Sequence, residues 1–143
     1  AALVHRLTQQ AFEEYRGQLE PPSSAHDETE AVVVAALVGG GALLAFIGDT
    51  AVGAARFVAE GEHLYIGRIA VPPNWRGKGI AMALMSALEQ QARELGLPAI
   101  ELGVRESLPS NVRLYEKLNY TVLRREQHPR NRDFISLRMR KEI

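Results

Sequence analysis

LYIGRIAVPPNWRGKGIAMALMSALEQQAREL, residues 64–95, holds the clearest run of structural signals in this chain. It predicts an apolar strand over residues 64–71, a Pro-Pro turn, a basic loop with two glycines, and an alanine- and leucine-rich helix. The first turn of a helix presents backbone N–H groups without intrahelical partners at the positive end of the helix dipole. Glycine leaves those groups accessible to a ligand, and the neighbouring basic side chains add positive charge. The loop therefore predicts an anion site, and we expect a ligand that carries phosphate.

Composition indicates an ordinary soluble globular domain without a bulk charge. The 143 residues fit one domain, residues 1–143, because domains most often contain roughly 100–150 residues. The hydrophobic share of 46% and the charged share of 24% indicate neither disorder nor a fibrous repeat. Lysine and arginine together number 17, and so do aspartate and glutamate. This balance argues against nucleic acid or an acidic membrane surface as a partner, so any attraction for anions is local.

Targeting and redox signals point to a cytoplasmic location. The chain has no cysteine, which excludes disulfides and thiolate chemistry and permits a reducing compartment. Its longest apolar stretch, residues 31–47, is interrupted by glycines and is shorter than the roughly 20 residues of a membrane span. The first residues lack the pattern of a signal peptide. We therefore expect a cytoplasmic protein without membrane association. Because the chain begins inside a predicted helix, we also expect an N-terminal segment to be missing from it.

The first half of the chain predicts helices followed by strands. Apolar residues at three- and four-residue steps predict a helix over residues 3–19. Residues 29–38 predict a second helix, with a strand as the competing interpretation because three consecutive valines lie there. Residues 41–47 and 50–59 predict two strands joined by a tight turn, and a second turn leads to the strand at residue 64. Three successive strands indicate an antiparallel meander.

The second half predicts a parallel unit and two more strands. The helix of residues 80–95 ends at Gly96, which can take the left-handed conformation. Four elements are predicted after it: a strand at 99–104, a helix at 109–118, and strands at 120–123 and 133–139. A strand, a helix and a strand in this order normally place the two strands side by side and parallel. The sequence therefore predicts an α+β fold with a mixed, mostly antiparallel sheet flanked by helices.

Two short segments resemble a known family. Residues 76–81, RGKGIA, resemble the R/Q-x-x-G-x-G/A motif of the GNAT superfamily of acyl-CoA-dependent N-acyltransferases, and they follow an apolar strand that ends IAVP, residues 69–72. Residues 114–120, LYEKLNY, look like the LYEKLGF segment of that family. The two segments have the family's order and separation, and the predicted strands and helices are similar to the family's along most of the chain. The resemblance implies a single GNAT-like domain with a parallel strand–helix–strand unit that binds acetyl-CoA.

The resemblance also implies a coenzyme site and a reaction. The family holds the coenzyme A pyrophosphate with the motif, which implies this role for Arg76, Gly77, Lys78, Gly79, Ile80 and Ala81. It pairs the pantetheine arm with the strand's main chain, here Ile69, Ala70 and Val71. An amine attacks the thioester directly, the backbone near a bulge in the strand polarises the carbonyl oxygen, and Tyr115 stands where the family's tyrosine protonates the departing thiolate. A phenol with a pKa of about 10 suits this step because the pKa of a thiol is not much lower.

The chain departs from the family's pattern in three places. The family often has an asparagine seven residues before the tyrosine, where this chain has Leu108, and Asn111 lies only four residues before Tyr115. Either Asn111 makes the same hydrogen bond one helical turn lower, or no side chain does. Asn119 replaces the usual glycine of the LGF segment, which has no consequence if this residue is a left-handed helix end. The family's first strand is absent, so we expect one edge of the sheet to be incomplete.

Several residues keep competing interpretations. Tyr115 could be a core tyrosine with a satisfied hydroxyl. The glycine loop alone could be a surface turn, and a nucleotide P-loop is disfavoured because Lys78 is not followed by serine or threonine. Four residues near the expected acceptor site are candidates for a general base, although such residues are more often solvated: Glu60, Glu62, His63 and Glu101. We assign no base and, because the other histidines lack ligand spacing, no metal.

Basic side chains of the later strands also have two interpretations. Arg68, on the central strand, either meets an acidic group of the acceptor or points to solvent or a carboxylate. A basic run between the last two predicted strands is interpreted as a solvated loop, with binding of the adenosine 3′-phosphate or an acidic acceptor as the alternative: Arg124, Arg125, Arg130 and Arg132. No aromatic residues are interleaved with this run, so it does not indicate nucleic acid binding.

The leading hypothesis is an N-acetyltransferase that moves the acetyl group of acetyl-CoA to a primary amine by direct attack in a ternary complex. The absence of cysteine excludes a cysteinyl acyl-enzyme. One alternative is a non-catalytic acyl-CoA-binding sensor or interaction module of the same fold, and another is a peptide- or protein-binding domain without coenzyme. The sequence leaves open whether the acceptor is a small molecule, a peptide or a protein lysine. An exposed sheet edge would often be covered by a partner, so a homodimer is one possible assembly.

Overall fold

The structure is a computed structural model that describes residues 1–12, 40–128 and 131–143 of the chain. Its strands are β1 (Gly41–Ile47), β2 (Thr50–Glu60), β3 (His63–Ala70), β4 (Ala99–Arg105), β5 (Thr121–His128) and β6 (Asn131–Glu142). Its helices are α1 (Ala2–Phe12), α3 (Ile80–Glu94) and α4 (Pro109–Lys117), with a short 3-10 turn η3 (Pro73–Trp75). The predicted α+β class is confirmed. The helix predicted at residues 29–38 and the second half of the first predicted helix lie outside the described residues.

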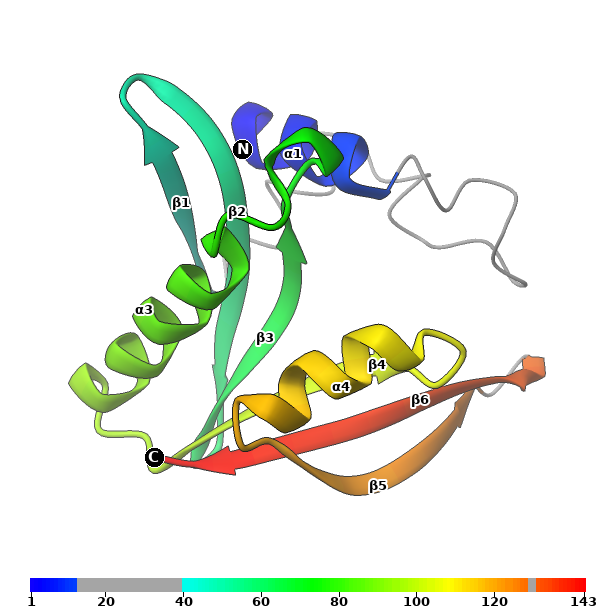
Figure 1. Cartoon of the computed structure of the whole chain (residues 1–143). Helices are drawn as coiled ribbons and strands as arrows, with labels where there is room; N and C mark the ends of the chain where they lie inside the picture. The colour runs from blue at the N-terminus through cyan, green and yellow to red at the C-terminus, as the bar shows by residue number, and fades with distance from the viewer. Residues whose placement is uncertain (13–39, 129–130) are drawn as a thin grey trace.

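One six-stranded sheet in the order β1-β2-β3-β4-β6-β5 forms the centre of the described part. β3 and β4 pair in parallel, and all other neighbours in this sheet pair antiparallel, as the sequence predicts. α3 makes the connection between the two parallel strands, so the strand–helix–strand unit is confirmed (Figure 1). The sheet is therefore two antiparallel portions joined along the pair β3 and β4.

The pair of β3 and β4 is short, and the two strands then separate. Their register covers only His63–Ile66 and Ala99–Leu102, although β3 continues to Ala70 and β4 to Arg105. At the same point the β2–β3 register shifts, so that Gly67 is an extra residue of β3 and forms a bulge. Figure 1 shows β3 and β4 diverging from their common end beside the C-terminus. The sheet is thus open on one side between its two central strands.

α3 and α1 cover opposite faces of the sheet. Ala55 of β2 belongs to the main core, which also contains Leu84 and Leu88 of α3. Ala54, the preceding residue, packs in a second cluster with Leu7 of α1. Consecutive residues of a strand point to opposite faces, so α1 lies on the face that α3 leaves uncovered. The face of the sheet that α1 covers is called the α1 face.

Both helices that follow the parallel strands end in the same backbone motif. At the end of α3, Gly96 has φ +73°, and Leu97 N donates to Ala92 O over 2.9 Å. At the end of α4, Asn119 has φ +72°, and Tyr120 N donates to Tyr115 O over 3.0 Å. These are the bonds of a Schellman motif, in which a left-handed residue satisfies the last carbonyls of a helix. The predicted left-handed positions of Gly96 and Asn119 are both confirmed.

The last two strands are longer than predicted, and the interpretation of the basic run as a loop is wrong. Arg124 and Arg125 lie in β5 and Arg132 lies in β6, while Arg130 lies outside the described residues. β5 is an edge strand, and its residues 121–127 are all exposed. The sequence of such a strand shows no alternation of apolar and polar residues, because neither face of the strand is buried over these residues.

We expect Asn119→Ala to lower the free energy of unfolding by about 1 kcal/mol, because alanine pays the full cost of a left-handed conformation. Asn119→Gly should leave the stability unchanged or raise it, since glycine adopts this conformation without strain. Urea unfolding of both variants measures the difference. Equal stability of the two variants would contradict the role of this residue as a helix end.

Candidate active site

The loop before α3 leaves the start of that helix open. Gly77 and Gly79 have φ +77° and +79°, and a Cβ at either position would meet nothing within 4 Å. The first backbone bond of the helix is donated by Ala83 N to Gly79 O over 3.0 Å, and no side chain among the described residues caps the end. The N–H groups before Ala83 therefore remain at the positive end of the helix dipole, where an anion binds favourably.

The side chain of Arg76 holds the loop in place. Its Nε donates to Val71 O over 2.9 Å and its Nη2 donates to Ala11 O over 2.7 Å. These bonds tie the loop to the end of β3 and to the end of α1. Lys78 is exposed beside the two glycines. The predicted binding roles of Arg76 and Lys78 stay predictions, and the structure adds a positioning role for the arginine.

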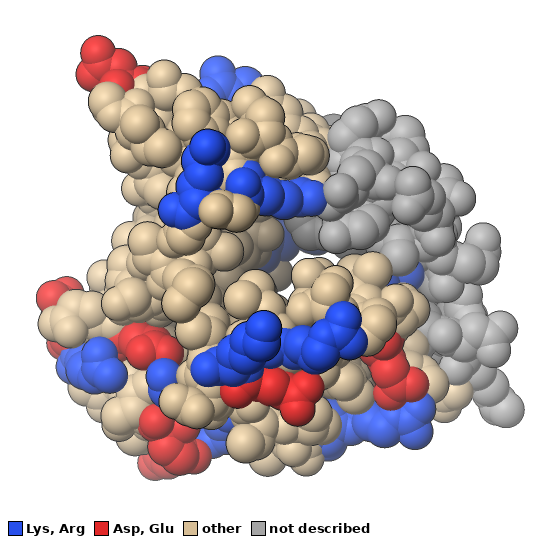
Figure 2. Space-filling view, viewed as in Figure 1, with Lys and Arg blue, Asp and Glu red and all other residues tan. Residues whose placement is uncertain are grey.

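The predicted pantetheine residues lie where β3 has separated from β4. Ala70 and Val71 are buried and Ile69 is half-buried, and none of the three belongs to the β3–β4 register. In the space-filling view, a hollow lies between the part of the molecule formed by α3 and its preceding loop and the part formed by α4. Lysine and arginine side chains border this hollow on both sides (Figure 2). The opening of the sheet thus leads to the start of α3.

Tyr115 and Asn111 lie on α4, one helical turn apart, on the other side of the opening. Both are half-buried. The Tyr115 ring packs edge-on against Tyr120, with 6.1 Å between the ring centroids. Desolvation by burial raises the pKa of the Tyr115 phenol from 10.0 to about 12. The expectation of a phenol with an ordinary pKa is therefore wrong, because tertiary burial disfavours the phenolate, and proton transfer to a thiolate is less balanced than the sequence suggested.

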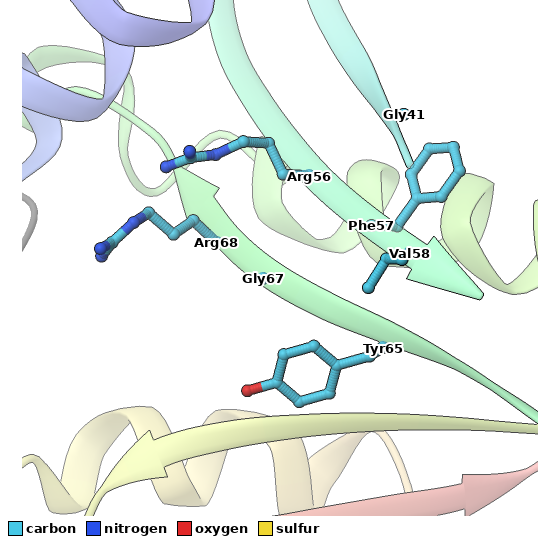
Figure 3. Close-up of a pocket in the computed structure, with 7 residues that line it drawn as sticks. All are labelled: Gly41, Arg56, Phe57, Val58, Tyr65, Gly67 and Arg68. Atoms are coloured by element: carbon cyan, nitrogen blue, oxygen red, sulfur yellow. The ribbon is translucent and has the colours of Figure 1, made fainter. Parts of the chain in front are cut away.

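A cavity of about 210 Å³ lies against β2 and β3. Two arginines that are Cα partners across these strands, Arg56 and Arg68, line it. Arg56 is only 8% exposed, and both guanidinium groups extend to the same side of the strands (Figure 3). Arg68 is a predicted candidate for contact with the acceptor, whereas Arg56 is not among the predicted residues. The available signal was a single charged residue in the middle of an apolar strand, β2.

The α1 face also carries a buried carboxylate, Glu101, which is 4% exposed. Arg138 Nε and Arg140 Nη1 donate to its two oxygens over 2.8 and 2.7 Å, and His63 Nδ1 lies 3.5 Å from it. Burial alone would raise the pKa of Glu101, but the hydrogen bonds from the two arginines and the charges around it outweigh burial and lower that pKa. Arg138 in turn lies over the Tyr65 ring, 4.3 Å from its centroid.

The candidate bases were expected to be solvated. For Glu101 this expectation is wrong, whereas Glu60 and Glu62 are exposed as expected. A carboxylate whose oxygens already accept bonds from two arginines is poorly suited to take a proton from an amine. Glu101 instead holds β6 against β4. The described residues contain no group of His, Asp and Glu side chains arranged to hold a metal ion. None of the helices within the described ranges has the length and apolar character of a membrane span.

Comparison with known proteins gives one consistent family. Residues 2–120 match the sequence model of the Acetyltransferase (GNAT) family. An acetyltransferase of Pectobacterium atrosepticum is 42% identical over 64 residues, which are 45% of this chain and 43% of that protein. The chain spans about half the length of the curated relatives it matches.

Solved structures share the fold at low sequence identity. A GCN5-related N-acetyltransferase from Rhodopseudomonas palustris has a TM-score of 0.79 at 22% identity, covering 99% of this chain and 89% of that one. A Bacillus subtilis acetyltransferase in complex with CoA has a TM-score of 0.71 at 20% identity, covering 80% of this chain and 84% of that one. These likenesses concern the arrangement of strands and helices.

We expect Glu101→Gln to lower the melting temperature by about 10 °C, because removing one partner of a buried ion pair leaves the arginines uncompensated. The pKa of Glu101 is lower in the folded protein than its ordinary value of 4.5. Its contribution to stability is therefore present above pH 4.5 and is lost as the pH falls through the lowered pKa. Calorimetry from acid to neutral pH should show the difference between variant and wild type shrinking in acid.

Glu106→Gln is the matched control. Glu106 accepts two bonds from Arg125, over 2.7 and 3.0 Å, but both side chains are exposed. Exposed ion pairs contribute little to stability, so this variant should melt close to wild type. Equal drops in melting temperature in the two variants would show that the burial of Glu101 does not increase the contribution of its ion pairs to stability.

Proposed function

This chain belongs to the Acetyltransferase (GNAT) family, and from that premise we propose that it transfers the acetyl group of acetyl-CoA to a primary amine. The observation that carries the proposal is the opening between β3 and β4, which has the uncapped start of α3 at one side and Tyr115 at the other. A thioester substrate with a phosphate-bearing tail needs both features. The bound CoA of the Bacillus subtilis acetyltransferase supports this choice of cosubstrate.

The pyrophosphate of the cosubstrate would be held by the loop and the first turn of α3. Two positive-φ glycines, Gly77 and Gly79, leave the backbone free of side chains there. A phosphate needs several N–H donors and a favourable dipole, and an uncapped helix start supplies both. Lys78 would add charge as an exposed side chain, and Arg76 would keep the loop in its conformation.

The pantetheine arm would occupy the place that a neighbouring strand has left. Ile69 and Val71 lie beyond the β3–β4 register, so β4 does not pair with their backbone, and the Val71 carbonyl accepts a bond from Arg76 Nε. An extended amide chain can add to such an edge as a strand does, by main-chain hydrogen bonds. The arm would then lead from the start of α3 toward the bulge at Gly67, which lies where the strands meet.

Acetyl transfer needs a neutral amine and a leaving thiolate. The amine nitrogen forms a bond to the thioester carbon and the carbon–sulfur bond breaks. The nitrogen releases one proton to solvent water, and the departing thiolate gains one from a protein donor, which regains a proton from solvent. We assign the Tyr115 phenol as the donor to the sulfur, and Asn111, four residues before it, as a side chain that binds the cosubstrate. Since the chain has no cysteine, the acetyl group passes directly to the amine without a cysteinyl intermediate.

One observation favours the alternative of a coenzyme-binding module without turnover. Burial raises the pKa of Tyr115 to about 12, which makes this phenol a weaker acid than an ordinary tyrosine. A domain that binds acetyl-CoA without transferring its acetyl group would show a higher melting temperature with acetyl-CoA but no release of free CoA with any amine.

We expect Tyr115→Phe to lower kcat about a hundredfold, because a positioned general acid contributes about that factor. The KM for acetyl-CoA should change little, since phenylalanine keeps the packing against Tyr120. In the wild type, the pKa of about 12 keeps the phenol protonated, so kcat should not fall between neutral pH and about pH 10 through its ionisation. Unchanged kcat in the variant would exclude Tyr115 as the proton donor.

We expect Gly79→Ala and Gly77→Ala to raise the KM for acetyl-CoA about tenfold, because a Cβ there disfavours the positive φ that holds the loop open. Gly61→Ala is the matched control. Gly61 also has a positive φ, +55°, and open space around its Cβ position, but it lies in the turn between β2 and β3. The control should lose stability without a change in KM. An equal rise in KM for all three variants would argue against phosphate binding at this loop.

A further inference from the structure

We propose that the acceptor amine also carries a carboxylate, as a free amino acid does, and that Arg56 and Arg68 bind this carboxylate in the cavity on the α1 face. The inference rests on the proposed acetyl transfer and names the class of its second substrate. It follows from the position of the two arginines, the closeness of the cavity to the expected position of the thioester, and the size and lining residues of the cavity.

The two arginines form a paired anion site. They are direct partners across β2 and β3, so their side chains leave the sheet from adjacent points on the same face. Both extend to the same side of the strands beside the cavity (Figure 3). Because they leave the sheet from adjacent points, one carboxylate in the cavity can accept hydrogen bonds from both guanidinium groups. Guanidinium is also the group whose planar donors best match a carboxylate.

The cavity adjoins the point where transfer would occur. Gly67, the bulge residue at which β3 leaves β4, is part of its wall. Ile69, which is expected to pair with the pantetheine arm, lies two residues farther along the same strand, a distance of roughly 7 Å at about 3.3 Å per residue. A small molecule can therefore place its amine at the opening of the sheet while its carboxylate reaches the arginines.

The dimensions and walls of the cavity favour a small acceptor. Its volume is about 210 Å³, which corresponds to roughly seven water molecules at about 30 Å³ each. Val58 and the ring of Tyr65 supply apolar wall on the side of the arginines (Figure 3), so the body of the acceptor can be apolar. The amine at the start of a peptide is followed by an amide instead of a carboxylate. A free amino acid therefore fits the charge of this cavity better than a peptide does.

Two other arginines on the same face do not line the cavity. Arg138 and Arg140 bind the two oxygens of Glu101, and Arg138 stacks on the ring of Tyr65, another residue of the cavity wall. Arg138, held by Glu101, thus fixes the position of the Tyr65 ring. The carboxylate of the acceptor is assigned to Arg56 and Arg68 because these two line the cavity itself.

The test compares amino acids with their α-carboxamides as acceptors for the full chain with acetyl-CoA. The readouts are free CoA release and the mass of the acetylated product. For the best acceptor, kcat/KM should be at least tenfold higher for the acid than for its amide, the factor expected for a charge-assisted hydrogen bond. Arg68→Met should remove this preference by lowering kcat/KM for the acid alone, and Arg68→Lys should restore part of it.

Two further variants complete the test. Arg56 is buried, so Arg56→Lys replaces it with a point charge, and its melting temperature is checked before kinetics. It should lower the preference for the acid, while the exposed control Arg93→Met, at the far end of α3, should keep it. The inference would be overturned, with acetyl transfer left intact, if kcat/KM were equal for acid and amide or higher for the amide. It would also be overturned if Arg68→Met lowered kcat/KM equally for both acceptors. No rise in melting temperature with acetyl-CoA and no CoA release with any amine would instead overturn the proposed function, and the inference with it.

Discussion

The parting of two parallel strands is the constraint on which the rest of this structure depends. β3 and β4 pair over His63–Ile66 and Ala99–Leu102 and then diverge. Backbone groups that lose a neighbouring strand inside a sheet need another partner, because a buried N–H or C=O without one is costly. Gly67 allows the change by forming a bulge against β2. The divergence leaves an opening between the two central strands, beside the start of α3.

Charge is distributed around this opening although the chain as a whole is neutral. Lysine and arginine equal aspartate and glutamate at 17 each, so the positive character is produced locally. On one side it comes from the uncapped start of α3, a dipole contribution that no residue count reveals. On the α1 face it comes from arginines, and the buried carboxylate Glu101 neutralises the part of that charge which lies on β6. Arg56 of β2 and Arg68 of β3 line the cavity on the same face.

The sequence correctly predicts the features that depend on a few neighbouring residues. The turns, the helix ends at Gly96 and Asn119, and the parallel unit follow from glycine conformation and chain connectivity. The sequence does not predict the features that depend on the register between strands. Arg56 meets Arg68 only because of the bulge in β3, and a slip of one residue would turn one of them to the other face. The burial of Glu101 similarly depends on Arg138, 37 residues away. The exposed edge strand β5 has no buried face and hence no alternation to recognise.

For Tyr115, local sequence determines the position of the residue, whereas the tertiary structure determines the acidity of its phenol. Its place is set locally, since Tyr120 N donates to its carbonyl over 3.0 Å and the helix ends there. Its acidity is set by tertiary burial, which raises its pKa to about 12. Relative to an ordinary phenol, that shift weakens the acid about a hundredfold. The same burial keeps the phenol neutral at every physiological pH, and a neutral phenol is the form that can donate a hydrogen bond to sulfur. In the proposed reaction, proton transfer from Tyr115 would therefore accompany carbon–sulfur cleavage, when the basicity of the sulfur is developing, because the resting phenol is too weak an acid to lose its proton beforehand.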